Sequence, residues 1–221
     1  RDDCAIGRAA VQRRFLALWF PLLPTDRLLR DPRCARQDDG PLVLIDRQRG
    51  AMRLTACDAG ALSLGLSPGM ALADARARVP ELVAAAADPV ADAAWLERIA
   101  DACDRFTPLV EAEPPDGLVL DMTGCLHLFD GEPGLILAVE AMLQRWASRW
   151  RLALAATPEG ARALARFQSA PATSEAAALR RLPVAALEAS AEAERGLRRA
   201  GLKTLGDLAD RPAAPLAARF G

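Results

Sequence analysis

Short apolar runs, each closed by proline or glycine, divide the first two thirds of the chain into alternating strands and helices. An uninterrupted apolar run of five to seven residues is typical of a buried strand, whereas apolar residues three or four apart predict a helix. On this basis strands are expected at 14–20, 41–46, 51–57, 82–86, 109–113, 116–122 and 151–156. Helices are expected at 71–79, 88–106, 135–149 and 159–167, with a shorter one near Leu28 that Thr25 or Asp26 would cap.

The last quarter of the chain changes character, because strand patterns vanish after Ser174. Short helices are expected at 176–182, 184–189, 191–200, 205–209 and 215–220. Gly201 is placed to end one helix in the left-handed conformation, and Thr204 is placed to cap the next. The pattern is that of a helix-hairpin-helix unit, which binds phosphates through backbone N–H groups, or of a plain hairpin of two helices.

The fold class that follows is α+β. Residues 82–167 give the order strand, helix, strand, strand, helix, strand, helix. This contains a split β-α-β-β-α-β motif, which would place a mostly antiparallel sheet on two helices. An all-α region follows it.

Composition narrows the function without identifying it. The 221 residues carry a net charge of -1 and are 52% hydrophobic, and they contain no apolar run long enough to cross a membrane. A near-neutral chain has no overall basic field, which argues against a tight, autonomous nucleic-acid binder. Residues 1–12 are expected to be a loose lead-in rather than a secretory signal. The cysteines Cys4, Cys34, Cys57, Cys103 and Cys125 form no close pair, which favours reduced thiols in a cytoplasmic protein over a zinc site or disulfides.

The clearest candidate chemistry lies in the stretch from Glu113 to Gly124. Asp116 and Asp121 stand at the two ends of the expected strand at 116–122. A carboxylate beside an apolar strand is stable only when it is solvated, hydrogen-bonded or bound to a cation. The stretch is therefore either an ordinary strand end or the remnant of a metal site. His127, the only histidine, has no second ligand at a suitable spacing.

Four blocks together resemble the Y-family translesion DNA polymerases of the DinB and UmuC type. The third block, 116–123, is similar to the family pattern D-E-A-Y-L-D-V-T, and the others are 16–23, 55–71 and 182–208. The resemblance implies a palm with its first strand at 13–23, fingers at 24–81, the rest of the palm at 82–170 and a helix-hairpin-helix thumb at 171–221. A little-finger domain and a C-terminal tail would follow Gly221.

The resemblance also shows where the family's metal-binding acids would stand. Active members hold two divalent ions with acids from two strands. In this sequence the first-strand acid is replaced by Ala17, Asp116 is kept, and the glutamate after it is replaced by Gly117. Trp19 is expected to fill the space of the lost metal site. We therefore expect no catalytic residue, no bound metal and no cofactor, with Mg²⁺ relevant only to an active alternative.

The nucleotide-binding positions depart from the family in the same way. The family's tyrosine and triphosphate-binding arginine correspond to Asp58 and Ala61. Arg162 lies on the helix where the family has a phosphate-binding lysine, and it is a possible remnant of that site. In the thumb, the usual Gly-x-Gly turn is replaced by residues 188–191.

This loss of acids is similar to the ImuB proteins, which are Y-family homologues without polymerase activity. The resemblance implies an adaptor in damage-induced, SOS-type mutagenesis and DNA repair. It would bind an error-prone replicative-type polymerase, a RecA-like ImuA-type protein and the sliding clamp, the last through segments beyond residue 221. Location in the bacterial cytoplasm, near the nucleoid, and no membrane contact would follow.

Two other hypotheses remain open. One is an active, divergent polymerase that groups Glu113, Asp116 and Asp121 around ions. The other is a purely protein-binding module. Weak binding of primer-template DNA through the thumb would separate the adaptor from this module, and the cations expected to carry it are Arg195, Arg198, Arg199 and Lys203. Those cations are equally typical of a solvated helix face paired with Glu192 and Glu194.

Overall fold

The computed structural model describes residues 13–31 and 40–220. The expected lead-in at 1–12, Cys4, Cys34 and most of the loop before Gly40 lie outside the described residues. The chain divides into two compact units, one made of residues 18–118 and 136–151, the other of residues up to 17, 119–135 and 152 onward. Among the described residues, no helix combines the length and the apolar character needed to cross a bilayer.

A four-stranded sheet contains β1 (Phe15–Trp19), β5 (Val110–Glu113), β6 (Gly117–Asp121) and β7 (Arg151–Ala155) in the order β5-β6-β1-β7. The Phe20 N–H donates to the Asp116 carbonyl at 2.9 Å, and the Met122 N–H donates to the Arg14 carbonyl at 2.8 Å. These bonds join opposite ends of the two strands, so β1 and β6 are antiparallel. Both central strands are buried, which explains their continuous apolar sequence.

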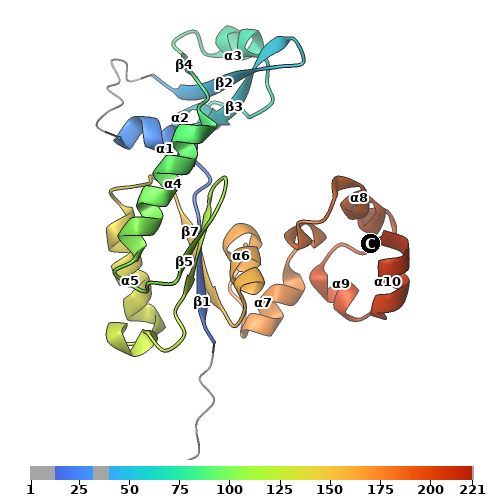
Figure 1. Cartoon of the computed structure of the whole chain (residues 1–221). Coiled ribbons are helices and arrows are strands. Elements are labelled where there is room, and N and C mark those ends of the chain that lie inside the picture. Colours follow the sequence, from blue (N-terminus) through green and yellow to red (C-terminus); the bar gives the residue numbers. More distant parts are fainter. Residues whose placement is uncertain (1–12, 32–39, 221) are drawn as a thin grey trace, which may run out of the picture. The chain divides into compact units, whose positions relative to one another are not determined.

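A second, three-stranded sheet contains β2 (Leu42–Gln48), β3 (Ala51–Cys57) and β4 (Val83–Ala86) in the order β3-β2-β4 (Figure 1). β2 and β3 form an antiparallel hairpin, and Arg49 and Gly50 make its turn with positive φ angles of 51° and 83°. Two short helices, α2 (Ala59–Ser63) and α3 (Leu72–Arg78), contribute to its core with buried alanines.

Contrary to what the sequence had suggested, the strand at 82–86 is not the first strand of the split motif. β4 pairs in parallel with β2, from Leu42 opposite Val83 to Ile45 opposite Ala86. It therefore belongs to the three-stranded sheet, and β1 supplies the fourth strand of the other sheet. Sequence order misled the interpretation because β4 directly precedes a long helix, as the first strand of the motif would.

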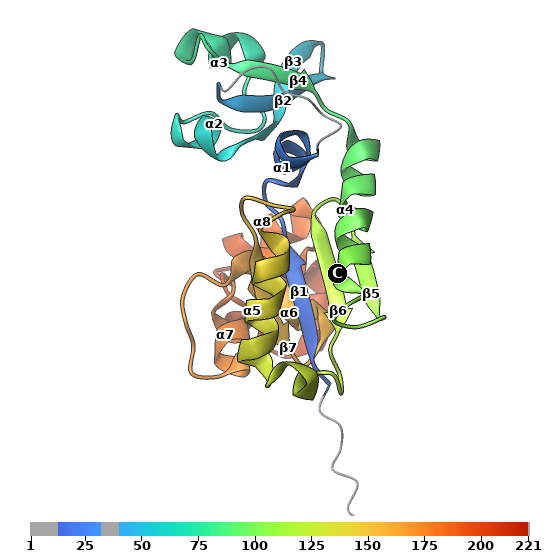
Figure 2. The same ribbon diagram turned by 90° about the vertical axis from the view of Figure 1, so that its left-hand side faces the viewer.

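Helix α1 (Leu23–Arg30) packs against the long helix α4 (Pro89–Cys103) (Figure 2). The expected cap at Thr25 or Asp26 is wrong, because the helix begins two residues earlier. The Thr25 hydroxyl donates to the Leu22 carbonyl at 2.9 Å, and the buried Asp26 carboxylate accepts the Ser148 N–H at 3.0 Å. The Thr25 bond is therefore local to the first turn of the helix, whereas the Asp26 bond joins α1 to a distant part of the chain.

Helix α5 (Glu132–Leu143) ends six residues before the expected Arg149. Beyond the helix, the Ala147 N–H donates to the Leu143 carbonyl at 3.0 Å, and the Ser148 N–H donates to Asp26. Trp146 instead packs edge-on against Trp95, with 5.1 Å between ring centroids. Trp146 and Trp150 therefore do not share a helix.

The remaining helices are short, as expected. They are a 3₁₀ turn η1 (Leu126–Phe129), α6 (Pro158–Phe167), α7 (Glu175–Arg181), a second 3₁₀ turn η2 (Val184–Leu187), α8 (Ala191–Arg199), α9 (Leu205–Ala209) and α10 (Ala213–Phe220). The last three gather in a compact cluster (Figure 1) whose core is Val184, Leu197 and Leu202. Gly201 has a φ of 81°, and Thr204 and Asp207 form a reciprocal cap on α9, so both local predictions are confirmed.

Candidate functional site

The candidate site lies where β1 ends beside the start of β6. Asp116 immediately precedes β6, and the Trp19 indole N–H, at the end of β1, donates to its carboxylate at 2.9 Å. The Arg151 guanidinium lies 5.8 Å from the centroid of the Trp19 ring. The surviving acid is thus bound by a hydrogen-bond donor and lies near a cation-capped indole.

The first strand supplies no oxygen ligand to this place. Ala17 and Trp19 are two residues apart on a strand, so their side chains share one face. Ala17 is buried, and Trp19 is the side chain on β1 that contacts Asp116. That Trp19 fills the space of a lost metal site stays a prediction, and the structure shows its hydrogen bond to Asp116. An indole N–H cannot coordinate a cation, because it has no lone pair to offer.

The second strand does not compensate. Asp121, the other acid proposed for an active arrangement, accepts the Thr123 N–H at 2.8 Å in the turn after β6. A rise of about 3.3 Å per residue puts its Cα about 16 Å from that of Asp116. Two ions that act together stand about 4 Å apart, so these two acids cannot share them.

The donor set therefore does not fit a pair of divalent ions. Gly117 brings no side chain, and Asp116 is the one carboxylate among the three positions predicted to correspond to the family's acids. Within 13–31 and 40–220 no group of three or more histidines, cysteines or acids is arranged to hold a metal ion. Hard divalent cations take six or more oxygen ligands, most of which this site cannot supply.

The expected nucleotide positions in the three-stranded region serve the fold. Asp58 caps α2, accepting the Ala61 N–H at 2.7 Å, and its second oxygen accepts the Leu42 N–H at 3.0 Å. Ala61 is fully buried in the core of this region. Neither side chain is placed to bind a phosphate.

Arg162 lies in a pocket of about 400 Å³ on α6. Its guanidinium is 3.9 Å from Glu159, and Glu188 also lines the pocket. Glu188 in turn lies 3.5 Å from the Arg166 guanidinium, so the cations at this pocket stand beside carboxylates and offer a triphosphate little net attraction. The geometry gives Arg162 no evident role in nucleotide binding.

The four cations predicted to contact DNA are all exposed on and just after α8. Arg198 pairs with Glu194 at 2.8 Å, while the Nε groups of Arg195 and Arg199 donate to backbone carbonyls of their own helix. The backbone N–H groups of Lys203 and Thr204 both donate to Asp207 at 2.9 Å. These bonds lower the pKa of Asp207, and they occupy donors that a phosphate could otherwise use.

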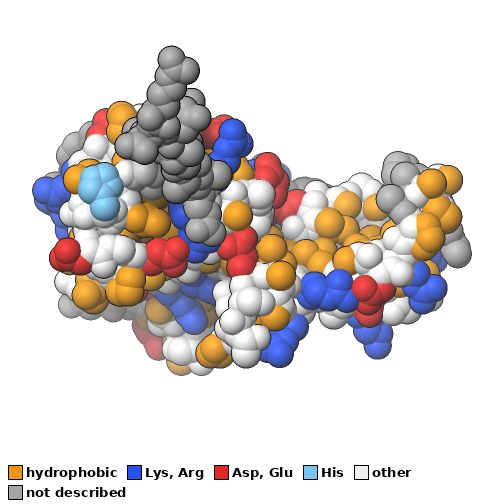
Figure 3. Space-filling view, turned by 90° about the horizontal axis from the view of Figure 1, so that it is seen from below, with side chains coloured by type: hydrophobic (Ala, Val, Ile, Leu, Met, Phe, Trp, Pro, Cys, Tyr) orange, Lys and Arg blue, Asp and Glu red, His pale blue; other side chains and the backbone are white. Residues whose placement is uncertain are grey.

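The turn before α8 has a residue other than glycine at a positive φ angle. Glu188 has a φ of 52°, and its carboxylate lies 3.5 Å from the Arg166 guanidinium. A carboxylate thus stands in the turn that contacts phosphate when it is built of glycines. On the face seen in Figure 3, blue and red side chains are interspersed, without a field of one sign.

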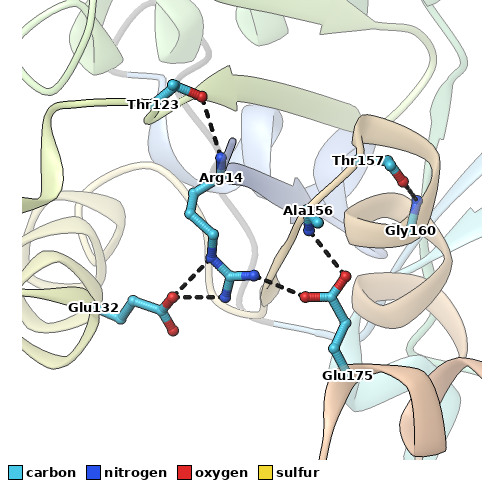
Figure 4. A network of polar contacts seen from close by, with 7 residues as sticks. All are labelled: Arg14, Thr123, Glu132, Ala156, Thr157, Gly160 and Glu175. Atoms are coloured by element: carbon cyan, nitrogen blue, oxygen red, sulfur yellow. Dashed lines mark hydrogen bonds and ion pairs between the residues drawn. The ribbon is translucent and has the colours of Figure 1, made fainter. Parts of the chain in front are cut away.

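Sequence reasoning missed a polar cluster around Arg14, at the start of β1 (Figure 4). The Arg14 guanidinium donates to Glu132 at 2.8 Å and to Glu175 at 2.7 Å, and its N–H donates to Thr123. Glu175 also accepts the Ala156 N–H. The partners are far apart in the sequence, so no local signal could have found them, and their role is structural.

Comparisons with known proteins agree with the resemblance. The model of the impB/mucB/samB family matches residues 28–193. The chain is 46% identical over 162 residues to Protein ImuB from two strains of Caulobacter vibrioides, NA1000 / CB15N and CB 15. This match covers 72% of the chain but 35% of the relatives, so the chain spans about a third of their length.

The solved structures confirm the polymerase-like fold. DinB from Sulfolobus solfataricus superposes with a TM-score of 0.68 at 18% identity, covering 95% of this chain and 63% of its own. An insertion ternary complex of Dbh DNA polymerase gives 0.70 at 17% identity and covers 94% and 63%. At this level of identity the likeness concerns the fold alone.

Proposed function

Since the chain belongs to the impB/mucB/samB family of Y-family polymerases and their homologues, we propose that it is a non-catalytic, polymerase-like adaptor in damage-induced translesion synthesis. Two features support this role: the polymerase-like fold is retained, and carboxylates that could bind a pair of metal ions are missing. Its partners would be an error-prone replicative-type polymerase, a RecA-like protein and the sliding clamp, in the bacterial cytoplasm. The clamp contact is assigned to segments outside these 221 residues.

One observation carries the proposal, namely the hydrogen bond from the Trp19 indole to Asp116. Nucleotidyl transfer in this family requires two ions that stabilise the attacking and leaving oxygens. Here the position facing the surviving acid holds a large aromatic donor, and Ala17 and Gly117 add no ligand. A polymerase-shaped protein without these ligands can still hold partners or DNA.

Primer extension tests the proposal directly. The 221-residue chain is incubated with primer-template DNA, all four nucleotides and either Mg²⁺ or Mn²⁺, beside an active Y-family polymerase as a positive control. We expect no template-dependent extension above background. The wild type and the Asp116→Asn variant should therefore give the same result. Incorporation that follows the template and disappears in the Asp116→Asn variant would refute the proposal.

Weak DNA binding through the thumb is the second part of the proposal. The contacts to phosphate would come from the exposed cations Arg195, Arg198, Arg199 and Lys203. Each contact would add about -0.9 to the slope of the logarithm of the association constant against the logarithm of the salt concentration. Charge reversal of all four is expected to abolish the salt dependence. Reversal of the exposed Arg76 and Arg78 on α3 is the matched control and should change nothing.

A protein-binding module without DNA contacts remains a competing function, and the acids of the thumb favour it. Glu188 stands in the turn before α8, and Glu192 and Glu194 lie in the first helical turn. Carboxylates there oppose phosphate binding at the helix N-terminus. DNA affinity that is undetectable at low salt would favour the module, and affinity that falls with salt would favour the adaptor with a DNA-binding thumb.

A further inference from the structure

A groove of about 430 Å³ lies along the C-terminal halves of α4 and α5, and none of its residues takes part in the candidate site. Its apolar lining includes Ala102 on α4 and Ala138 and Ala141 on α5. Small side chains leave room close to the helix backbones. An aliphatic side chain of another molecule can therefore reach this surface and bury apolar area against it.

One wall of the groove is rigid. Trp146 lines it and packs edge-on against the buried Trp95, with 5.1 Å between the ring centroids. The Arg98 guanidinium lies 4.6 Å from the Trp95 ring and 5.4 Å from the Trp146 ring, and it also pairs with Asp31 at 3.3 Å. Arg98 is thus fully engaged in holding the wall together.

Two other arginines are differently placed. Arg105, just after α4, and Arg145, just after α5, both line the groove and are exposed. Neither makes an ion pair or hydrogen bond with another side chain in the part of the chain that the structure describes. Arg145 is restrained only by its own neighbour, since its guanidinium lies 5.4 Å from the Trp146 ring.

The charges at the groove favour an anion. Two guanidinium groups contribute two positive charges, and the C-terminal ends of α4 and α5 each contribute about half a negative charge. About one positive charge remains over a lining that is polar at the arginines and apolar at the alanines. Asp101 and Asp104 are exposed nearby but do not line the groove. They would repel a long polyanion such as DNA, whereas a short acidic segment can avoid them.

We propose that this groove docks an acidic segment of a protein partner. Carboxylates of the partner would pair with Arg105 and Arg145, and an aliphatic side chain between them would rest on the alanines. Arginine favours such carboxylates because its planar donor fork binds both oxygens. The inference extends the proposed adaptor role by naming one docking surface and the chemistry of its partner.

The test uses a fluorescein-labelled dodecapeptide in which two glutamates alternate with two leucines. The 221-residue chain is titrated into this peptide, and binding is measured as the rise in fluorescence anisotropy. The control peptide has lysine in place of glutamate, and a labelled 20-base-pair DNA duplex is titrated in parallel. The protein variants are Arg105→Glu with Arg145→Glu, the groove-filling Ala141→Leu, and the control Arg76→Glu, which reverses an exposed charge on α3. Circular dichroism establishes that each variant is folded.

We expect the acidic peptide to bind at least tenfold more tightly than the lysine peptide. The double charge reversal should weaken this binding tenfold or more, Ala141→Leu should weaken it severalfold, and Arg76→Glu should leave it within twofold. Equal binding of both peptides, or unchanged binding by the double variant, would overturn the proposal. A larger loss of DNA binding than of peptide binding in the double variant would overturn it in favour of a nucleic-acid surface. The peptide titrations contain no DNA or nucleotide, so their failure is distinct from a failure of the primer-extension test.

Discussion

The most buried ion pair in the described chain gives the sharpest prediction for stability. The Arg27 Nε lies 2.6 Å from the Asp92 carboxylate, and these side chains are 7% and 13% exposed. The pair joins α1 to α4, and its removal leaves one charge without a partner in a place that water scarcely reaches. Burial raises the pKa of Asp92, although the Arg27 guanidinium acts against this rise.

We expect Arg27→Met to lower the free energy of unfolding by about 3 kcal/mol, because loss of one partner strands the other. This corresponds to a fall of roughly 6–12 °C in Tm for a chain of this size. Adding Asp92→Leu removes the stranded charge, so the double variant should return to within about 1 kcal/mol of the wild type. Urea denaturation and thermal melting measure both quantities.

The pH dependence gives an independent check on the same pair. A carboxyl whose pKa is raised in the folded state stabilises the fold at low pH, and this contribution is lost as the pH rises above the unfolded value of about 3.9. Without Arg27 the pKa of Asp92 should rise further. The defect of Arg27→Met is therefore expected to be largest near pH 7 and to shrink toward pH 4.

A matched control separates burial from the mere presence of a salt bridge. Arg198 lies 2.8 Å from Glu194, but the arginine side chain is 56% exposed. Arg198→Met should cost less than about 1 kcal/mol. The reasoning is refuted if Arg27→Met costs no more than this control, or if Asp92→Leu makes the Arg27→Met protein less stable still.

Two further predictions follow from packing. A methyl group at Gly134 would overlap the carbonyl oxygen of Phe129, so Gly134→Ala should destabilise the fold by about 2 kcal/mol or more in urea denaturation. Gly60→Ala in α2 should be neutral or stabilising. Equal effects of the two substitutions would contradict the packing described here. Burial raises the pKa of the Cys103 thiol to about 12. Iodoacetamide at pH 8 should therefore modify Cys103 at least tenfold more slowly than the partly exposed Cys125, as followed by peptide mass spectrometry. Comparable rates for the two thiols would contradict the burial of Cys103.

Local signals in the sequence predicted local structure well. The Gly201 turn and the Thr204 cap were both expected, because each depends on residues within a few positions of itself. The resemblance to the Y-family predicted the polymerase-like fold, and the order of subdomains that it implies stays a prediction. It also identified Asp116 as the acid to examine.

Long-range pairing was where sequence reasoning failed. Nothing near β4 shows that it pairs with β2 rather than with the sheet that contains β1. The Ser148 N–H donates to Asp26, which lies 122 residues before it, and no local signal shows this contact. The Trp19 indole was expected near the metal position, but only the structure shows that it binds Asp116.

The central claim is that the place around Asp116 cannot hold paired divalent ions. Isothermal titration of Mn²⁺ into the chain, with primer-template DNA and a non-hydrolysable nucleotide present, tests it most directly. The account predicts no Mn²⁺ uptake that depends on Asp116, so the wild type and the Asp116→Asn variant should give the same heats. Two ions bound per wild-type chain and lost in the Asp116→Asn variant would contradict it.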